Sequence, residues 1–442
     1  MNKTINFFKE IAKIPRESGN EEKITEYLCE FARKRNLEYY KDNYNNVLIK
    51  KKTSDANPLI LQAHTDMVCV SNKDFDFTKE SIEVIEKDGY LQANGTTLGA
   101  DNGIGVAFIL TILDCNIPCN IEAVFTSSEE TTMRGAENFD TTKLTGKYLL
   151  NLDGFDENVI IRASAAYHDL EMDTNFKKEK SSFGNTYKIT LSGLPGGHSG
   201  YDLDKNRGNA IIMLADFLKQ FKLELVSING GTKNNVFPTK AEALINTNED
   251  INQISFIDEY KNRYPNLKID VIKQEYIKDV LPNTSELLDF ISNFPSKALH
   301  YNKNNEPTTS LNLGNINNSH LEIGMRSTNK DEANKVLEML NNYGNKYNFS
   351  LKQVGYQPGF YSSEDSPLIK LLKETSPYKT KAEAKSLHIT VEAGFFQERI
   401  PDLEIAIISP NIKDAHSVNE RVSIQSISKT YKWLEEFIKA FK

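Results

Sequence analysis

The sequence has few of the features that mark secreted, membrane-spanning or nucleic-acid-binding proteins. Its 442 residues include only four cysteines, which are too sparse for a disulfide framework. No segment approaches the roughly 18 uncharged apolar residues of a membrane span. No long block of Lys or Arg accompanies the net charge of -8. Because the N-terminus also lacks an apolar signal core, we expect a cytoplasmic protein that binds neither nucleic acid nor membrane.

What the chain does contain is typical of a globular protein. Hydrophobic residues make up 39% of it and charged residues 26%. Cys115 and Cys119 are separated by three residues, and no second close pair completes a zinc site. We interpret the four cysteines as ordinary packing.

The length and the changing pattern of the chain predict two domains. A chain of 442 residues exceeds a typical single core. Residues 1–182 alternate strand-like runs such as "NPLILQAH" with helical patterns such as "GIGVAFILTILDC", which predicts a mostly parallel mixed sheet flanked by helices. Residues 183–349 alternate polar and apolar positions, as half-exposed antiparallel strands do. Residues 350–442 return to the alternation of strands and helices seen in residues 1–182.

We therefore predict an α/β catalytic domain built from residues 1–182 and 350–442, with an α+β lid domain, 183–349, inserted into it. Two domains in series are the alternative. That arrangement would leave the C-terminal segment with too little core to fold.

Polar side chains follow the apolar runs of the predicted sheet. Ligand crevices of open α/β sheets lie beyond the carboxyl ends of the strands, so ionisable groups at these ends are expected to meet. Taken singly, an Asp at a strand end is usually a turn or a helix cap, and a Glu pair is usually a solvated surface. The recurrence in five segments favours a site, formed by His64, Asp66, Asp101, Glu129, Glu130, Asp153 and His416.

This set matches the needs of a two-metal centre. Two metals that share a bridging carboxylate use about five protein ligands, and five are available in His64, Asp101, Glu130, Asp153 and His416. Asp66 lies on the same side of an extended chain as His64 and is expected to orient its imidazole. Glu129 is the candidate general base for a metal-bound water.

The sequence resembles the aminoacyl-histidine (Xaa-His) dipeptidases, which include carnosine-cleaving enzymes, within the co-catalytic zinc metallopeptidases. The resemblance covers nearly the whole chain, and its motifs occur in the family's order. The most specific pair is "GTTLGADNGIG" and "GGHSG"; His-x-Asp alone is weak. The other stretches are "LQAHTDMV", "TSSEETTMRGAENF", "NLDG", "GLPGGHSG", "INGGTKNNVFP", "MRS", "QPGFYSSEDSPL", "HITVEAGFF" and "DAHSVNERV".

The resemblance implies a role for each residue. His64 and Asp153 would bind one metal, Glu130 and His416 the other, and Asp101 would bridge the two. The ions would be Zn²⁺, with Mn²⁺ or Co²⁺ as alternatives. Glu129 would be the general base and acid, and Asp66 would orient His64. From the lid, His198 would stabilise the oxyanion, while Asn235 and Arg326 would hold the substrate's terminal carboxylate.

The resemblance implies a dipeptidase for Xaa-His substrates such as β-alanyl-histidine, with lid closure over the substrate and a possible homodimer. An N-acyl amino-acid deacylase or a tripeptidase is the alternative within the same chemistry, and a non-catalytic peptide-binding scaffold is the alternative outside it. The chain departs from the family at "IRASAAYHDL" after "NLDG" and at Ala393, where cysteine is common. Neither departure touches a ligand position, so both bear on substrate preference.

Overall fold

The structure is a computed structural model that describes residues 2–252, 254–378 and 382–441. Two compact units divide the chain. The first comprises Met1–Ser164, Pro358–Leu387 and Val391–Lys442, and the second comprises Ala165–Gln357 and His388–Thr390. Among the described residues, no helix combines the length and apolarity that crossing a membrane requires.

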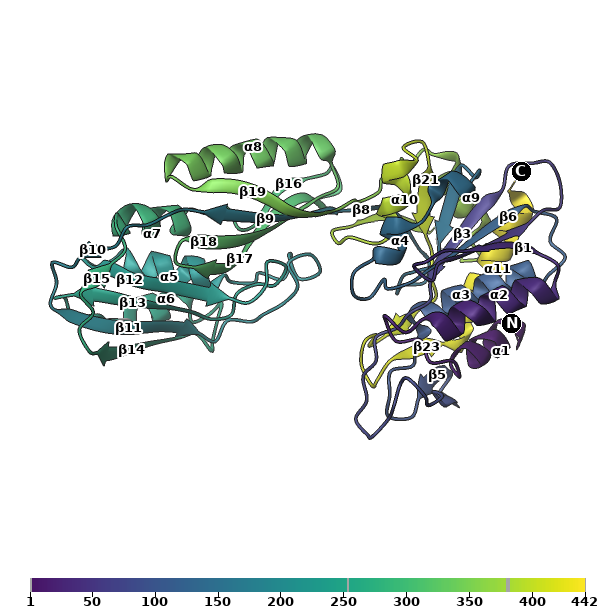
Figure 1. Ribbon diagram of the computed structural model, residues 1–442, viewed down its shortest axis with the longest axis horizontal. Helices are drawn as coiled ribbons and strands as arrows, with labels where there is room; N and C mark the ends of the chain where they lie inside the picture. The colour runs from purple at the N-terminus through teal and green to yellow at the C-terminus, as the bar shows by residue number, and fades with distance from the viewer. Residues whose placement is uncertain (1, 253, 379–381, 442) are drawn as a thin grey trace. The chain divides into compact units, whose positions relative to one another are not determined.

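An eight-stranded mixed sheet forms the centre of the first unit (Figure 1). Four of its neighbouring strand pairs are parallel, namely β3–β6, β3–β7, β21–β7 and β20–β8, while β1–β2, β2–β6 and β21–β8 are antiparallel. In spatial order the strands are β1 (Glu38–Lys41), β2 (Val47–Lys51), β6 (Ile121–Thr126), β3 (Leu59–His64), β7 (Tyr148–Asn151), β21 (Glu404–Ile407), β8 (Val159–Ser164) and β20 (Glu383–Leu387).

Helices flank this sheet, and one of them, α3 (Ala100–Leu113), is enclosed on all sides. Every residue of α3 is buried, which explains why its sequence, "ADNGIGVAFILTIL", shows no polar face. The helices of this unit are α1 (Asn2–Ile11), α2 (Glu22–Lys34), α3 (Ala100–Leu113), α4 (Arg134–Asn138), α9 (Pro367–Thr375), α10 (Gly394–Arg399) and α11 (Ile424–Ala440), with a 3₁₀ turn at Thr141–Lys143.

A small four-stranded sheet brings the C-terminal part of the chain beside residues 84–93. Its strands lie in the order β22 (Ile412–Lys413), β23 (Arg421–Ser423), β5 (Tyr90–Ala93) and β4 (Val84–Lys87). The loop between β22 and β23 carries His416 and Glu420. The pairing of β23 with β5 therefore fixes this loop next to the segment that leads into α3.

The second unit is an antiparallel α+β structure. Its main path is β14 (Lys268–Gln274), β11 (Asn185–Ser192), β13 (Ala241–Thr247), β12 (Glu224–Gly231), β17 (Pro307–Asn317), β18 (His320–Ser327), β9 (Ala166–Asp173) and β19 (Ser350–Gln357), and β16 (Ala298–Tyr301) pairs with β17. A separate pair joins β10 (Glu179–Lys180) to β15 (Asp279–Val280). The helices are α5 (Ala210–Leu218), α6 (Ile254–Tyr260), α7 (Thr284–Ser292) and α8 (Lys330–Lys346).

The predicted α/β class, with a mostly parallel mixed sheet and an interrupting α+β unit, is confirmed. The unit boundaries lie at 164/165 and 357/358 rather than at 182/183 and 349/350. The reason is strand pairing: β9 lies between β18 and β19 and pairs with both, so both flanking segments belong to the second unit's sheet.

Candidate metal centre

The carboxyl ends of three adjacent parallel strands deliver most of the predicted ligands to one place. His64 is the last residue of β3, and Asp153 follows β7 by two residues. Glu129 and Glu130 follow β6, which lies on the other side of β3. Asp101 is the second residue of α3. The structure thus brings these groups together at the edge where an open sheet binds its ligands.

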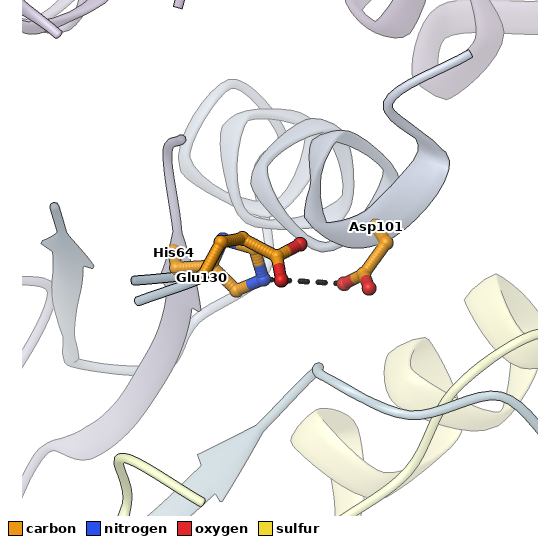
Figure 2. Close-up of side chains that lie close together, drawn as sticks. All are labelled: His64, Asp101 and Glu130. Carbon is orange, nitrogen blue, oxygen red and sulfur yellow. Dashed lines mark hydrogen bonds and ion pairs between the residues drawn. The ribbon is translucent and has the colours of Figure 1, made fainter. Parts of the chain in front are cut away.

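Asp101 lies between two imidazoles. Its Oδ1 is 3.1 Å from His64 Nε2, and its Oδ2 is 3.1 Å from His416 Nε2. Glu130 Oε1 is also 3.1 Å from His416 Nε2, and Asp153 Oδ1 is 3.8 Å from His64 Nε2. Figure 2 shows His64, Asp101 and Glu130 converging on a common point. A carboxylate with one oxygen toward each histidine has the arrangement that a bridging ligand needs.

Two overlapping groups of side chains could each hold an ion. Ligand atoms of His64, Asp101 and Glu130 all lie within 4.8 Å of one another, and so do those of His64, Glu129 and Asp153. The second group contains Glu129, which the sequence analysis assigns to catalysis and not to ligation. The geometry therefore leaves two roles for Glu129, that of a metal ligand and that of a general base.

Asp66 forms hydrogen bonds with the segments that carry the predicted ligands. Its carboxylate accepts hydrogen bonds from the main-chain N–H groups of Glu129 (3.0 Å) and Glu130 (3.2 Å) and from the hydroxyl of Ser18 (2.7 Å). His64 Nδ1 lies 3.2 Å from the Asp66 carbonyl oxygen and 3.4 Å from its carboxylate. Since both are acceptors, Nδ1 carries a hydrogen, and Nε2 is the ring nitrogen that can bind a metal once its own hydrogen is displaced.

The electrostatics of the buried groups favour bound cations. Burial raises the pKa of Asp153 well above its ordinary value, and the charge of Asp101 raises it further. Burial opposes ionisation of His64, but Asp153, Asp101 and Asp66 outweigh it and raise the His64 pKa. Hydrogen bonds with Asp101 and Glu130 raise the pKa of His416 to about 10. Protons thus compensate the carboxylates here, and divalent cations can replace them.

The donor set fits the divalent ions that the sequence predicts. Two imidazole nitrogens and several carboxylate oxygens are the ligands of catalytic zinc, and the same types suit Mn²⁺ and Co²⁺. The residues present therefore fit a metal pair, although their individual assignments stay predictions.

Glu420, which the sequence analysis did not single out, caps the segment that presents Asp101. Its buried carboxylate accepts hydrogen bonds from the main-chain N–H groups of Leu98 (2.8 Å), Gly99 (2.9 Å), Ala100 (2.8 Å) and Asp101 (3.2 Å). These N–H groups would otherwise have no partner at the start of α3. Its position four residues after His416 gave the only signal, because it lies inside "DAHSVNERV".

Arg16 was also missed, and it ties two of the loops together. The buried guanidinium donates from Nη1 to the carbonyl oxygens of Thr65 and Asp66 (both 3.0 Å) and from Nη2 to that of Gly99. Gly99 has a φ of 70°, and an added Cβ there would collide with Arg16. Arg16 lies beyond the end of α1, in the charged stretch "KIPRESGNEEK", where a single Arg gave no distinctive pattern in the sequence.

The three predicted residues of the second unit lie together there. His198 Nε2 is 3.0 Å from Arg326 Nη2, and the main-chain N–H of Ser199 donates to the carbonyl oxygen of Asn235 (2.9 Å). Arg326 is 5% exposed, and its guanidinium lies 4.6 Å from the centroid of the Tyr167 ring. Burial and the charge of Arg326 lower the His198 pKa to about 4, so this imidazole is neutral near pH 7.

Comparisons with known proteins agree with this geometry. Residues 60–440 match peptidase family M20/M25/M40. The cytosol non-specific dipeptidase of Escherichia coli K12 is 29% identical over 98% of this chain and 96% of its own length. The structure of aminoacylhistidine dipeptidase from Vibrio alginolyticus superposes with a TM-score of 0.89 at 26% identity, covering 100% of this chain and 96% of that one. A tripeptidase from Staphylococcus aureus shares the fold, with a TM-score of 0.59 at 16% identity and coverage of 99% and 98%.

Proposed function

Because the chain belongs to peptidase family M20/M25/M40 and is a metallopeptidase, we propose that it hydrolyses dipeptides of the Xaa-His type, including β-alanyl-histidine. The similarity to aminoacylhistidine dipeptidase and to the E. coli dipeptidase supports this substrate class. The E. coli relative is by name cytosolic, and we propose a cytoplasmic location here as well. The single observation that carries the proposal is Asp101, with one carboxylate oxygen facing each of two imidazoles.

In this proposal, His64 and Asp153 would hold one divalent ion, Glu130 and His416 would hold the other, and Asp101 would be a ligand common to both. Zn²⁺ is the first candidate, with Mn²⁺ or Co²⁺ as alternatives. When bound, such ions lower the pKa of a water molecule from about 15.7 toward neutrality and polarise a peptide carbonyl. Asp66 keeps the His64 imidazole in the tautomer that can bind a metal.

Glu129 moves the proton. Burial raises the pKa of its carboxyl well above the ordinary value, while His64 opposes the rise. A carboxylate with a raised pKa can accept a proton from water as the oxygen attacks the carbonyl carbon. It can then return that proton to the leaving amine nitrogen when the C–N bond breaks, so the carboxylate is regenerated at the end of each turnover.

His198 and Arg326 present two donors to one place. The Nδ1 of His198 faces the main-chain N–H groups of Gly200 and Tyr201, both at 3.2 Å, and therefore accepts. Its Nε2 must then carry the hydrogen. Arg326 Nη2, 3.0 Å away, can only donate. Two adjacent donors require an acceptor between them, and we propose that the substrate's oxygens fill this need, with Asn235 as the third contact.

Metal removal tests the chemistry. We expect protein treated with a chelator to lose hydrolysis of β-alanyl-histidine and to regain it with Zn²⁺, Mn²⁺ or Co²⁺, because the proposed reaction depends on the ions to lower the pKa of water. Activity is measured by release of free histidine, with chelator that is already saturated with metal as the control. Hydrolysis that persists in metal-free protein would contradict the proposal.

A substrate panel distinguishes the alternatives. β-Alanyl-histidine, several Xaa-His and Xaa-Ala dipeptides, a tripeptide and N-acetyl-histidine are compared by kcat/KM. A dipeptidase should have its highest kcat/KM with β-alanyl-histidine and the other dipeptides. A preference for N-acetyl-histidine would identify a deacylase, and a preference for the tripeptide would identify a tripeptidase. Binding without turnover of any of them would leave a peptide-binding scaffold.

Arg326 is tested through the substrate carboxylate. We expect Arg326→Met to lower kcat/KM about 30-fold or more, which corresponds to about 2 kcal/mol for a buried charge pair that loses one partner. A dipeptide amide, which has no terminal carboxylate, should lose much less from the same substitution. The measurement compares kcat/KM of the unsubstituted and the Arg326→Met proteins, each with the dipeptide and with its amide. Equal losses for the acid and the amide would remove the carboxylate contact from the proposal.

A further inference from the structure

A row of buried polar side chains crosses the sheet beneath the metal centre, and the proposed mechanism does not use it. It consists of Thr126 at the end of β6, Gln62 in β3, Asn151 at the end of β7, and Glu392, which precedes α10. All four are 0% exposed. Strands buried on both faces are normally apolar, and buried polar groups are costly unless they are paired. Four of them at this one edge require a reason.

Hydrogen bonds join the row into a chain. Gln62 Nε2 donates to Glu392 Oε1, and Thr126 donates its hydroxyl hydrogen to the same oxygen (2.8 Å). Asn151 Nδ2 donates to Gln62 Oε1. Asn151 Oδ1 then accepts from the main-chain N–H of Asp153 (2.7 Å). The chain therefore begins at Glu392 and ends at the backbone of a predicted metal ligand.

The two ends of this chain fix its direction. A carboxylate oxygen such as Glu392 Oε1 accepts, so Gln62 must turn its amide nitrogen toward it and its oxygen toward Asn151. The main-chain N–H of Asp153 only donates, so Asn151 must turn its oxygen toward it. Both ends demand the same orientation of both amides. Two donors face Oε1, so a proton on Glu392 would occupy Oε2, and Oε1 would accept in either state.

This chain of hydrogen bonds reaches the predicted ligands of one ion and not those of the other. It ends at Asp153, and its central member, Gln62, lies two residues before His64 on the same side of β3. Asp153 and His64 are the two predicted ligands of one ion. Glu130 and His416, the predicted ligands of the other, receive no hydrogen bond from this row among the described residues.

Packing alone does not explain why the carboxyl group of Glu392 is buried. Its Oε2 has no hydrogen-bond partner among the described side chains and main-chain groups. A buried carboxyl with one unpaired oxygen is destabilising relative to an apolar residue of similar size. Its charge lies in the field of His64, Asp153 and Glu129, where bound cations would stabilise it.

We propose that Glu392 is a positioning residue for the ion held by His64 and Asp153, and that it acts through Gln62 and Asn151. The inference rests on the two-metal part of the proposed function. It assigns the row one task, which is to hold the Asp153 segment and the His64 strand at the spacing that this ion requires. Groups that hydrogen-bond to metal ligands contribute about 10- to 100-fold to metal affinity in known sites.

The test is a titration of metal-free protein with Co²⁺ alone, followed by visible absorption and calorimetry. In the unsubstituted protein we expect two binding steps. Glu392→Ala should weaken one of them about 10- to 100-fold and leave the other unchanged. Glu392→Gln keeps an acceptor at the Oε1 position and should restore most of the affinity. Asn151→Ala should weaken the same step, and the double variant should be little worse than either single variant.

Glu122 provides a matched control in the same sheet. This carboxylate is 2% exposed and lies near the start of β6, where it accepts hydrogen bonds from Thr145 and Gly146. Glu122→Ala should lower the thermal stability while leaving both Co²⁺ steps unchanged.

The possible results distinguish failure of the positioning role from failure of the two-metal proposal. A Glu392→Ala protein with both steps intact, or with both weakened equally, overturns the positioning role. If that protein does not fold, Asn151→Ala alone decides in the same way. An unsubstituted protein that binds fewer than two ions instead overturns the two-metal proposal, and the inference falls with it.

Discussion

Replacing Glu129 with glutamine is expected to lower kcat for dipeptide hydrolysis by about 10²- to 10⁴-fold, the range typical of lost general acid–base catalysis. Glutamine keeps the size and the hydrogen-bonding shape of the side chain but cannot take a proton from water. The substrate is expected to bind as before, so KM should change little. Steady-state kinetics with β-alanyl-histidine, together with the metal content per chain, give the two quantities.

The metal content decides between the two roles that the geometry allows. Glu129 lies with His64 and Asp153 in a group that could bind an ion. If Glu129 is a ligand, Glu129→Gln should bind one ion less. If it is the base, the variant should keep two ions and lose turnover. Glu130→Gln is the matched control, because Glu130 is the proposed ligand next to Glu129, and its substitution should lower the metal content. Near-normal turnover with two ions bound would remove Glu129 as the base.

Much of the centre could be predicted because strand ends are visible in a sequence. Apolar runs locate β3, β6 and β7, and the sheet order places β3 between the other two. The first ionisable residues after each run must then meet at one edge. His64, Asp153 and the Glu129–Glu130 pair follow this rule. His416 does not follow a strand directly, and its position depends on β23 pairing with β5, which no local pattern predicts.

The supporting residues could not be predicted, and the reason is physical. Glu420, Arg16 and Glu392 act through main-chain groups or through side chains distant in sequence. Glu392 contacts Gln62 across a separation of 330 residues. A single Glu or Arg in a loop reads as a surface residue, since these side chains are rarely fully buried. Only the fold shows that all three are buried.

The unit boundaries show a similar limit. Residues 166–173 read as a half-exposed strand, which the first domain's helices and strands could equally accommodate. Their assignment depends on the partners of β9, which come from residues 320–327 and 350–357. Antiparallel pairing between such distant segments leaves no trace in local composition, whereas the helices α3, α5, α8 and α11 were predictable from their own residues.

Replacing Asp101 with asparagine is expected to release both ions and to lower kcat/KM by more than the roughly 100-fold typical of residues that only support metal ligands. Asparagine offers one oxygen where the carboxylate offers two, and it carries no charge to offset two cations. The amide nitrogen would face either His64 or His416. Metal content after dialysis, a Co²⁺ titration and dipeptide kinetics measure the effect.

Asp114, at the C-cap of the same helix, is the matched control for Asp101. It pairs with Lys3 and Arg35 near the surface, so Asp114→Asn should cost at most about 1 kcal/mol of stability and leave metal binding unchanged. Because Glu420 holds the main chain at Asp101 from the other side, Asp101→Asn is expected to keep its local fold. A loss of both ions would therefore result from the missing carboxylate oxygen and not from misfolding. Loss of only one ion would make Asp101 a ligand of a single metal and would contradict the bridge.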